Sequence, residues 1–142
     1  MMGIIYSLIA GVFISFQGVF NTKLSDKAGF WFTNAWVHGS GFLLSLILLL
    51  IMKDGSFSKF FTVNKLYWLG GVLGVMIIFT VTKSISALGP AYSVALLLIT
   101  QLVISMLIDS LGLFGVDKVP LSANRLLGIG IMIAGIIVFK LK

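Results

Sequence analysis

The sequence predicts an all-α, polytopic membrane protein with five transmembrane helices. Of its 142 residues, 59% are hydrophobic and 10% are charged, and the mean hydropathy is +1.16. A soluble domain carries about 25% charged residues, and disorder requires low hydrophobicity, so both of these classes are excluded. The charges stand between uncharged runs long enough to cross a hydrocarbon core of about 30 Å. Such spans are helical, because a helix satisfies every backbone amide within its own segment in lipid.

Each uncharged run is assigned one helix. We expect the helices at about 3–22, 29–52, 66–88, 91–114 and 122–141, within one transmembrane domain that covers residues 1–142. Gly89 and Pro90 separate the third and fourth helices, because these two residue types are the strongest helix breakers. The first run is kept as a helix rather than a cleaved signal peptide, since its basic residues follow the apolar stretch. Five spans leave no aqueous domain, so an enzyme is not expected.

Polar side chains gather on one face of several predicted helices. Gln17 and Asn21 lie beside a face of small residues in the first helix, opposite a bulky apolar face that suits lipid. Asn34 and His38 stand four apart in the second helix, and the fourth helix carries Gln101. We predict that these five residues line a substrate path. Gln17, Asn21, Asn34 and His38 would form one layer, with Gln17 and Asn34 at similar depths and Gln101 nearer mid-membrane. The alternative is that the amides only join helices by hydrogen bonds.

Two ionisable side chains inside apolar runs are candidates for proton coupling. Asp109 is the one carboxylate well inside such a run, and an intramembrane carboxylate is a functional candidate by default. Its place near a helix end equally suits an interfacial cap, and His38 equally suits a structural hydrogen bond. Lys83 either snorkels to the surface or lines the path. With no cysteine and one histidine, neither a metal site nor a cofactor is expected.

Small residues at helical spacing predict close helix contacts. We assign this packing role to Gly70 and Gly74 in the third helix, and to Gly128, Gly130, Ala134 and Gly135 in the fifth. The fifth helix is expected to form the contact of a homodimer.

Basic residues are divided equally between the two sides of the predicted topology. One side receives Lys53, Lys59, Lys65, Lys118 and Arg125, and the other receives Lys23, Lys27, Lys83, Lys140 and Lys142. An excess of Lys and Arg normally sets orientation, and here there is none. We therefore expect both orientations and an antiparallel homodimer. The alternative is a single orientation with one or two charges assigned to the wrong side. Because the charges flank apolar runs, the expected partners are the lipid bilayer, a second copy and a small solute, with no nucleic acid.

Several segments match a known pattern. The most specific are Ile108–Gly115, Pro120–Ser122 and Arg125–Gly128, and the segments Trp68–Gly74 and Leu88–Ala91 also fit. In these segments the chain resembles the YdcZ family, a five-helix branch of the drug/metabolite transporter superfamily. Thr100 departs from the pattern, since the family usually has glycine there. The resemblance covers nearly the whole chain and implies a multi-pass protein of the bacterial inner membrane with a transport role.

The chain is more distantly similar to the four-helix small multidrug resistance transporters. Their first helix carries a glutamate that binds proton and cationic substrate in competition, whereas this sequence has Gln17, so that coupling does not carry over. The predicted function is a secondary transporter or facilitator, an exporter, for a small polar or cationic solute, through a polar cavity at the dimer interface. A small dual-topology ion channel and a non-transporting membrane subunit are the alternatives.

Overall fold

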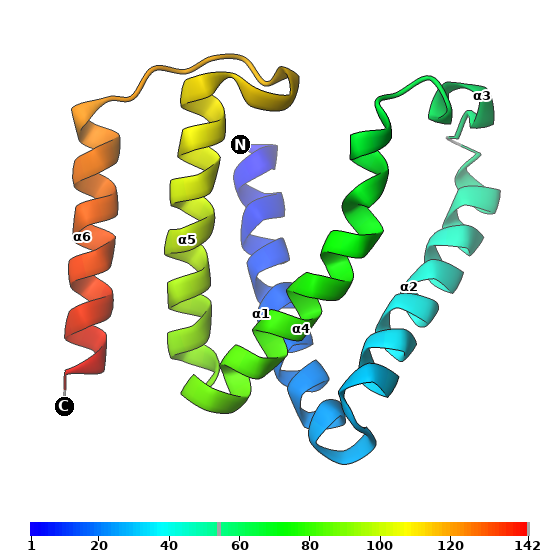
Figure 1. The fold of residues 1–142 in the computed structure, drawn as a ribbon, viewed down its shortest axis with the longest axis horizontal. Coiled ribbons are helices and arrows are strands. Elements are labelled where there is room, and N and C mark those ends of the chain that lie inside the picture. The colour runs from blue at the N-terminus through cyan, green and yellow to red at the C-terminus, as the bar shows by residue number, and fades with distance from the viewer. Residues whose placement is uncertain (54, 142) are drawn as a thin grey trace. The chain divides into compact units, whose positions relative to one another are not determined.

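The computed structural model describes residues 1–53 and 55–141, and it confirms the all-α membrane fold. Within these residues every regular element is a helix, and five helices are long and apolar enough to cross a membrane (Figure 1). The chain divides into two compact units, Met1–Ser86 and Ala87–Lys142, which are described separately below. Lys142, which the charge count includes, lies outside the described residues. The antiparallel dimer and the single domain stay predictions.

A helical hairpin begins the first unit. α1 (Met2–Ala28) and α2 (Phe30–Met52) pack together and are joined by Gly29 alone, which has φ 87° and ψ 153°. α1 continues past its predicted end at residue 22 and includes the charged residues Lys23 and Lys27. Charges end the stretch that can lie in hydrocarbon, but they do not end a helix, because lysine is a good helix former. The two helices diverge from the turn (Figure 1).

After α2 the chain forms an aromatic cluster before it re-enters an apolar span. The elements are α3 (Phe57–Phe60), the 3₁₀ helix η1 (Lys65–Leu69) and α4 (Gly70–Leu88). Phe60 stacks on Trp68 with ring centroids 5.0 Å apart, and Phe61 meets both rings edge-on. Aromatic rings, above all tryptophan, concentrate at membrane interfaces, so this cluster marks one end of the hydrocarbon region. The predicted helices leave residues 53–65 as a connection, and the sequence did not predict this cluster.

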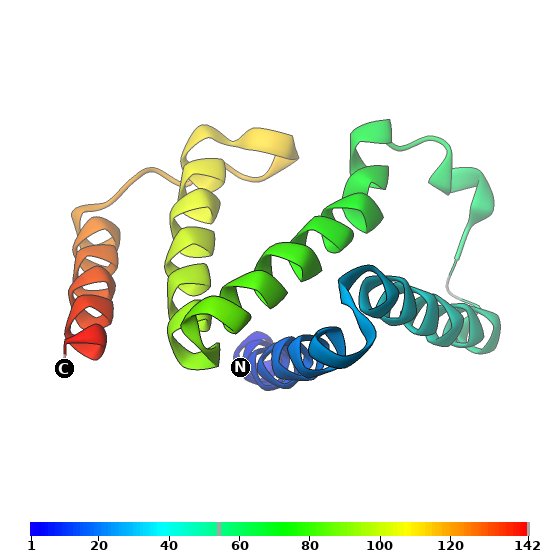
Figure 2. The same cartoon turned by 60° about the horizontal axis from the view of Figure 1, so that its bottom comes forward.

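α4 contacts both helices of the hairpin and runs obliquely to them (Figure 2). The ring of Phe79 lies edge-on to Phe30 at 4.8 Å and parallel to Trp31 at 6.0 Å. On α1, a Cβ added at Gly18 would lie 2.9 Å from Cδ1 of Ile85. Gly18 therefore allows α4 to approach α1 near the middle of that helix, while α4 meets α2 at Phe30 and Trp31, beside the turn.

The second unit is another helical hairpin. Its elements are α5 (Pro90–Leu111), the 3₁₀ helix η2 (Leu113–Gly115) and α6 (Ala123–Lys140). α5 and α6 lie side by side in both views (Figures 1 and 2). Nζ of Lys140 lies 5.0 Å from the ring centre of Tyr92 at one end, and Nη1 of Arg125 lies 3.8 Å from Oδ2 of Asp109 at the other. The two contacts thus join opposite ends of an antiparallel pair of helices.

Glycines in left-handed or extended positive-φ conformations set the helix boundaries. As predicted, the helix breaks between residues 88 and 90, where Gly89 has φ 79°. α5 ends three residues before its predicted end at Phe114, because Gly112 has φ 66° and donates its N–H to the carbonyls of Ile108 and Asp109. This is a common way to close a helix, since glycine reaches positive φ without a Cβ clash.

We predict that Gly29→Ala lowers the free energy of unfolding by about 1–3 kcal/mol, because the φ and ψ of Gly29 lie in a region that is essentially reserved for glycine. Gly39→Ala is the matched control, since it lies within α2, has no neighbour within 4 Å of an added Cβ and should gain helix propensity. Reversible unfolding in detergent would measure both. An equal effect of the two variants would contradict the proposed role of the turn.

Candidate functional site

The interior of the first unit is polar. Where α1, α2 and α4 meet, the buried polar side chains are Asn21, Thr22, Thr33, Asn34 and Thr82. The one apolar side chain buried in this unit, among those that the structure describes, is Ile85. Large apolar side chains instead cover the outside of the helices, as suits contact with lipid. The site is therefore sought in this polar interior.

Two of the buried hydroxyl groups have partners within their own helices. Oγ1 of Thr22 donates to the carbonyl of Gly18 at 2.8 Å, and Oγ1 of Thr33 donates to the carbonyl of Gly29 at 2.9 Å. A hydroxyl bonded in this way to the carbonyl one turn earlier needs no further partner. Both threonines are explained by packing alone.

Asn34 and His38 are not explained in that way. Nδ2 of Asn34 donates to the backbone carbonyl of Val75 on α4 at 3.1 Å, which joins α2 to α4. Oδ1 of Asn34, which is 3% exposed as a residue, and Nε2 of His38 are buried and have no hydrogen-bond partner among the described residues. Leaving a buried polar atom unsatisfied costs about 1–3 kcal/mol. The two atoms lie one turn apart on α2, so the same face of the helix carries both vacant positions.

Gly74 makes room for the imidazole. A Cβ at Gly74 would lie 2.9 Å from Cε1 of His38, whereas a Cβ at Gly70, one turn earlier, would meet nothing within 4 Å. Of the predicted glycine pair in α4, Gly74 is therefore the member in close contact with another element. The close contact is with a polar ring rather than with a helix backbone.

Next to this interior, α1 and α2 enclose an open groove of about 400 Å³. Its lining residues are Gln17, Asn21, Leu24, Trp36, Val37, Ser40, Gly41 and Leu44. Gln17 is exposed toward the groove, and Asn21 is buried at its base. The divergence of the two helices and the small residues Ser40 and Gly41 keep the groove open. The structure thus brings the two predicted residues of α1 to one surface.

The four residues of the predicted layer face two surfaces: Gln17 and Asn21 line the groove, whereas Asn34 and His38 face α4. We call their stepwise spacing along α1 and α2 the staircase. At about 1.5 Å per residue, Asn34 lies about 7.5 Å along its helix from Gly29, His38 about 13.5 Å, Asn21 about 12 Å and Gln17 about 18 Å. Gln17 is therefore more than twice as far along its helix from the turn as Asn34, so the equal spacing on which the prediction of similar depths was based is wrong. It placed the centre of the turn near residue 25, whereas α1 continues to Ala28. Measured along their helices from Gly29, the four residues follow one another in the order Asn34, Asn21, His38 and Gln17.

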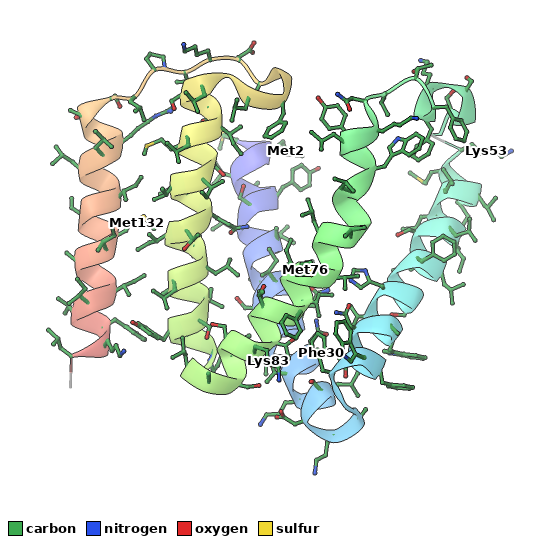
Figure 3. The ribbon with its side chains drawn as sticks, in the orientation of Figure 1. Met2, Phe30, Lys53, Met76, Lys83 and Met132 are labelled. Carbon is green, nitrogen blue, oxygen red and sulfur yellow. The ribbon has the colours of Figure 1, made fainter. Side chains whose placement is uncertain are left out.

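The remaining predicted residues lie elsewhere. Gln101 is exposed on α5 in the second unit, and Lys83 is exposed on the last turns of α4 (Figure 3). Asp109 is half-buried and forms an ion pair with Arg125, a partner that the sequence analysis did not assign. The available signal was the opposite charge of two residues on either side of one short loop. Within the described residues there is no group of three or more histidine, aspartate or glutamate side chains that could hold a metal ion.

The small residues of α6 are divided between two surfaces. Gly128 lines a groove with α5, whereas Gly130 and Ala134 line a separate hollow on α6. A Cβ at Gly128, Gly130 or Gly135 would meet no atom of the described chain within 4 Å. These glycines therefore serve no close contact inside the chain as described. A dimer contact through α6 stays a prediction, with Gly130 and Ala134 as the pair that shares one face.

Comparison with known proteins assigns the family. The sequence model described as "Putative inner membrane exporter, YdcZ" matches residues 2–138. The chain belongs to the YdcZ family. YdcZ membership and the five apolar helices identify a multi-pass protein of the inner membrane, in a family described as exporters rather than as enzymes. The chain matches no curated protein and no solved structure at a significant level.

We predict that Gly74→Ala destabilises the protein by about 1–3 kcal/mol, because the new methyl group overlaps the imidazole of His38. Gly70→Ala is the matched control on the same helix. In a double-mutant cycle measured by unfolding in detergent, His38→Ala should remove most of the cost of Gly74→Ala. Equal losses for Gly70→Ala and Gly74→Ala, or additive effects with His38→Ala, would contradict this contact.

Proposed function

We propose that this YdcZ protein is a secondary transporter or facilitator that exports a small polar or cationic solute through the staircase of Asn34, His38, Asn21 and Gln17. The observation that carries the proposal is the pair of unpartnered buried atoms, Oδ1 of Asn34 and Nε2 of His38. Structural hydrogen bonding would leave neither atom vacant, since a helix-joining amide is most useful when fully paired. The direction of transport rests on the description of the family alone.

The chemistry of the vacant positions favours a solute that donates hydrogen bonds. Oδ1 of Asn34 only accepts, and Nε2 of a neutral His38 accepts when its proton is on Nδ1. Gln17, at the other end of the staircase, offers both an acceptor and a donor. An ammonium or hydroxyl group satisfies such a set. A path without a carboxylate binds a cation weakly enough for it to leave again, which suits a transporter.

An antiparallel homodimer would complete the path. In one chain the staircase begins near the turn at Gly29 and ends with Gln17, near the middle of α1. It therefore serves about half of the membrane thickness. An inverted second copy, held through Gly130 and Ala134 of α6, would place the same four residues in the other half. Inverted repeats of this kind supply the two equivalent gates of alternating access.

If transport is coupled to protons, we infer that His38 is the carrier. His38 lies within the staircase and has a vacant ring nitrogen, whereas Asp109 already faces the guanidinium of Arg125. Gln101 belongs to the proposed path only if the second unit lines it, which the variants below also test.

We predict that purified protein in proteoliposomes gives saturable flux of methylamine or putrescine, above that of glucose. Gln17→Leu should lower this flux about tenfold, which corresponds to the loss of about one hydrogen bond to the solute, without changing the unfolding transition. Flux that depends on pH in the native protein and not in His38→Gln would assign the coupling proton to His38.

Thr80→Val is the matched control for Gln17→Leu, because it also removes an exposed polar group from the first unit but lies outside the groove. Gln101→Leu tests the fourth predicted amide in the same assay. Full flux in Gln17→Leu would contradict the proposed path and would leave the staircase residues with a structural role only. Single-channel currents in place of saturable flux would identify a channel, and neither signal would identify a non-transporting subunit.

We predict that both membrane orientations occur in equal amounts. The native chain has no cysteine, so Ser58→Cys in α3 and Asp26→Cys near the opposite turn each introduce a single thiol. A membrane-impermeant maleimide on intact cells should label about half of each variant, because the basic residues show no side preference. Complete labelling of one variant and none of the other would show a single orientation and exclude the antiparallel dimer.

A further inference from the structure

A second groove, of about 590 Å³, lies between α5 and α6 and is separate from the staircase. Its walls are largely apolar and include Leu102, Met106, Ile129 and Met132, the last of which lies midway along α6 (Figure 3). Its one charged end is formed by Asp109 and Arg125. Asp109 stands two residues before the end of α5, and Arg125 stands two residues after the start of α6. The charges therefore lie at the level of the lipid headgroups, and the apolar walls extend toward the membrane centre.

The ion pair is loose and keeps its hydrogen-bonding capacity. Nη1 of Arg125 and Oδ2 of Asp109 are 3.8 Å apart, which is longer than a hydrogen bond, and the two side chains are 42% and 38% exposed. No hydrogen bond of either side chain to another described residue is found. The carboxylate can accept, and the guanidinium can donate, to a third molecule that enters between or beside them.

The backbone holds Asp109 in place. Its carbonyl accepts hydrogen bonds from the N–H of Gly112 at 3.3 Å and of Val119 at 2.9 Å, so the loop after α5 folds back over the end of the helix. At the start of α6, Oγ of Ser122 accepts from the N–H of Arg125 at 3.4 Å and caps the helix. Both charged residues thus stand on helix ends whose backbone is held by hydrogen bonds.

We propose that this groove binds a zwitterionic phospholipid with a primary ammonium headgroup, such as phosphatidylethanolamine. The guanidinium of Arg125 binds the phosphate, for which its planar fork is suited. The carboxylate of Asp109 accepts from the ammonium, which the two-carbon ethanolamine link keeps next to the phosphate. One acyl chain lies along the apolar walls, where Leu102 and Met132 stand seven residues, or about 10 Å of helix, from the charged end. This site does not depend on the proposed transport function.

The charge pattern selects among lipids. The pair is neutral in sum, so an anionic lipid such as phosphatidylglycerol gains the attraction of Arg125 but meets the repulsion of Asp109. Phosphatidylcholine presents the same net charge as phosphatidylethanolamine, yet its quaternary ammonium has no N–H for Asp109. The groove also extends beyond the charged end, between Leu102 and Met132. A free amino acid with a short side chain would leave this apolar part empty, whereas an acyl chain would fill it.

The test is lipid retention by the full chain in detergent, measured by native mass spectrometry with phosphatidylethanolamine, phosphatidylcholine and phosphatidylglycerol of identical acyl chains. We expect about tenfold more retained phosphatidylethanolamine than either other lipid, which corresponds to one charge-assisted hydrogen bond. Asp109→Asn should remove this preference and raise retention of phosphatidylglycerol. Arg125→Gln should lower retention of all three. Asp117→Asn, in the loop outside the groove, is the matched charge control and should change nothing.

A steric variant tests the acyl chain without touching the charges. Gly128 lines the groove, and an added Cβ there meets no atom within 4 Å, so Gly128→Leu should fold and should lower retention of every lipid. Gly71→Leu on α4, where the added Cβ is equally unopposed, is its control. Equal retention of phosphatidylethanolamine and phosphatidylcholine in the native protein, or an unchanged preference in Asp109→Asn, would overturn the proposal. Stabilisation by free leucine that is lost in Asp109→Asn, without lipid preference, would assign the groove to a free zwitterion instead.

Discussion

In hydrocarbon no water is present to satisfy a polar group, and most of this structure follows from that constraint. Backbone groups are paired within five helices, and hydroxyl groups find partners within their own helix. Those of Ser7, Ser15, Ser45, Thr80 and Thr100 each donate to the carbonyl four residues earlier, at 2.8–2.9 Å. All five residues are exposed. A hydroxyl that is paired in this way can face lipid, so these residues need no functional explanation.

The same constraint makes the exceptions informative. Asn34 is half satisfied, because Val75 accepts from its amide nitrogen while its oxygen stays vacant, and His38 beside it has a vacant nitrogen. Oγ of Ser93, near the start of α5, is the third such atom among the described residues. Interhelical hydrogen bonds in membranes contribute about 0.6 kcal/mol on average, less than the cost of an unsatisfied buried atom. Stability alone therefore does not favour Asn34 and His38 with unpaired buried atoms. This is why we assign the two residues to a solute path.

The number and type of the helices could be predicted from the charges, but their ends could not. Lys23 and Lys27 mark where the hydrocarbon span ends, and the helix continues beyond them until Gly29. The turn of the hairpin is therefore at Gly29 and not near residue 25. The four polar residues consequently lie at different distances from the turn. Gln17 and Asn21 both line one groove, since residues four apart on a helix share a face. The pairing of Asp109 with Arg125 depends on how the loop between α5 and α6 folds, which local patterns do not encode.

Two features support the proposed antiparallel dimer. The staircase lies in one half of each chain, and the basic residues are divided equally between the two sides of the membrane. Along α1, the small-residue face is packed against α4 near Gly18 but is open at Gly3 and Gly11, where an added Cβ would meet nothing within 4 Å. This follows from the course of α4, which comes close to α1 at Gly18, near the middle of that helix, and not at Gly3 or Gly11. A parallel partner would add a second staircase in the same half of the membrane and leave the other half without one. An inverted partner would instead bring its staircase to the half of the membrane in which the first chain has none of these four residues. The equal distribution of basic residues permits such a partner, since neither orientation is disfavoured.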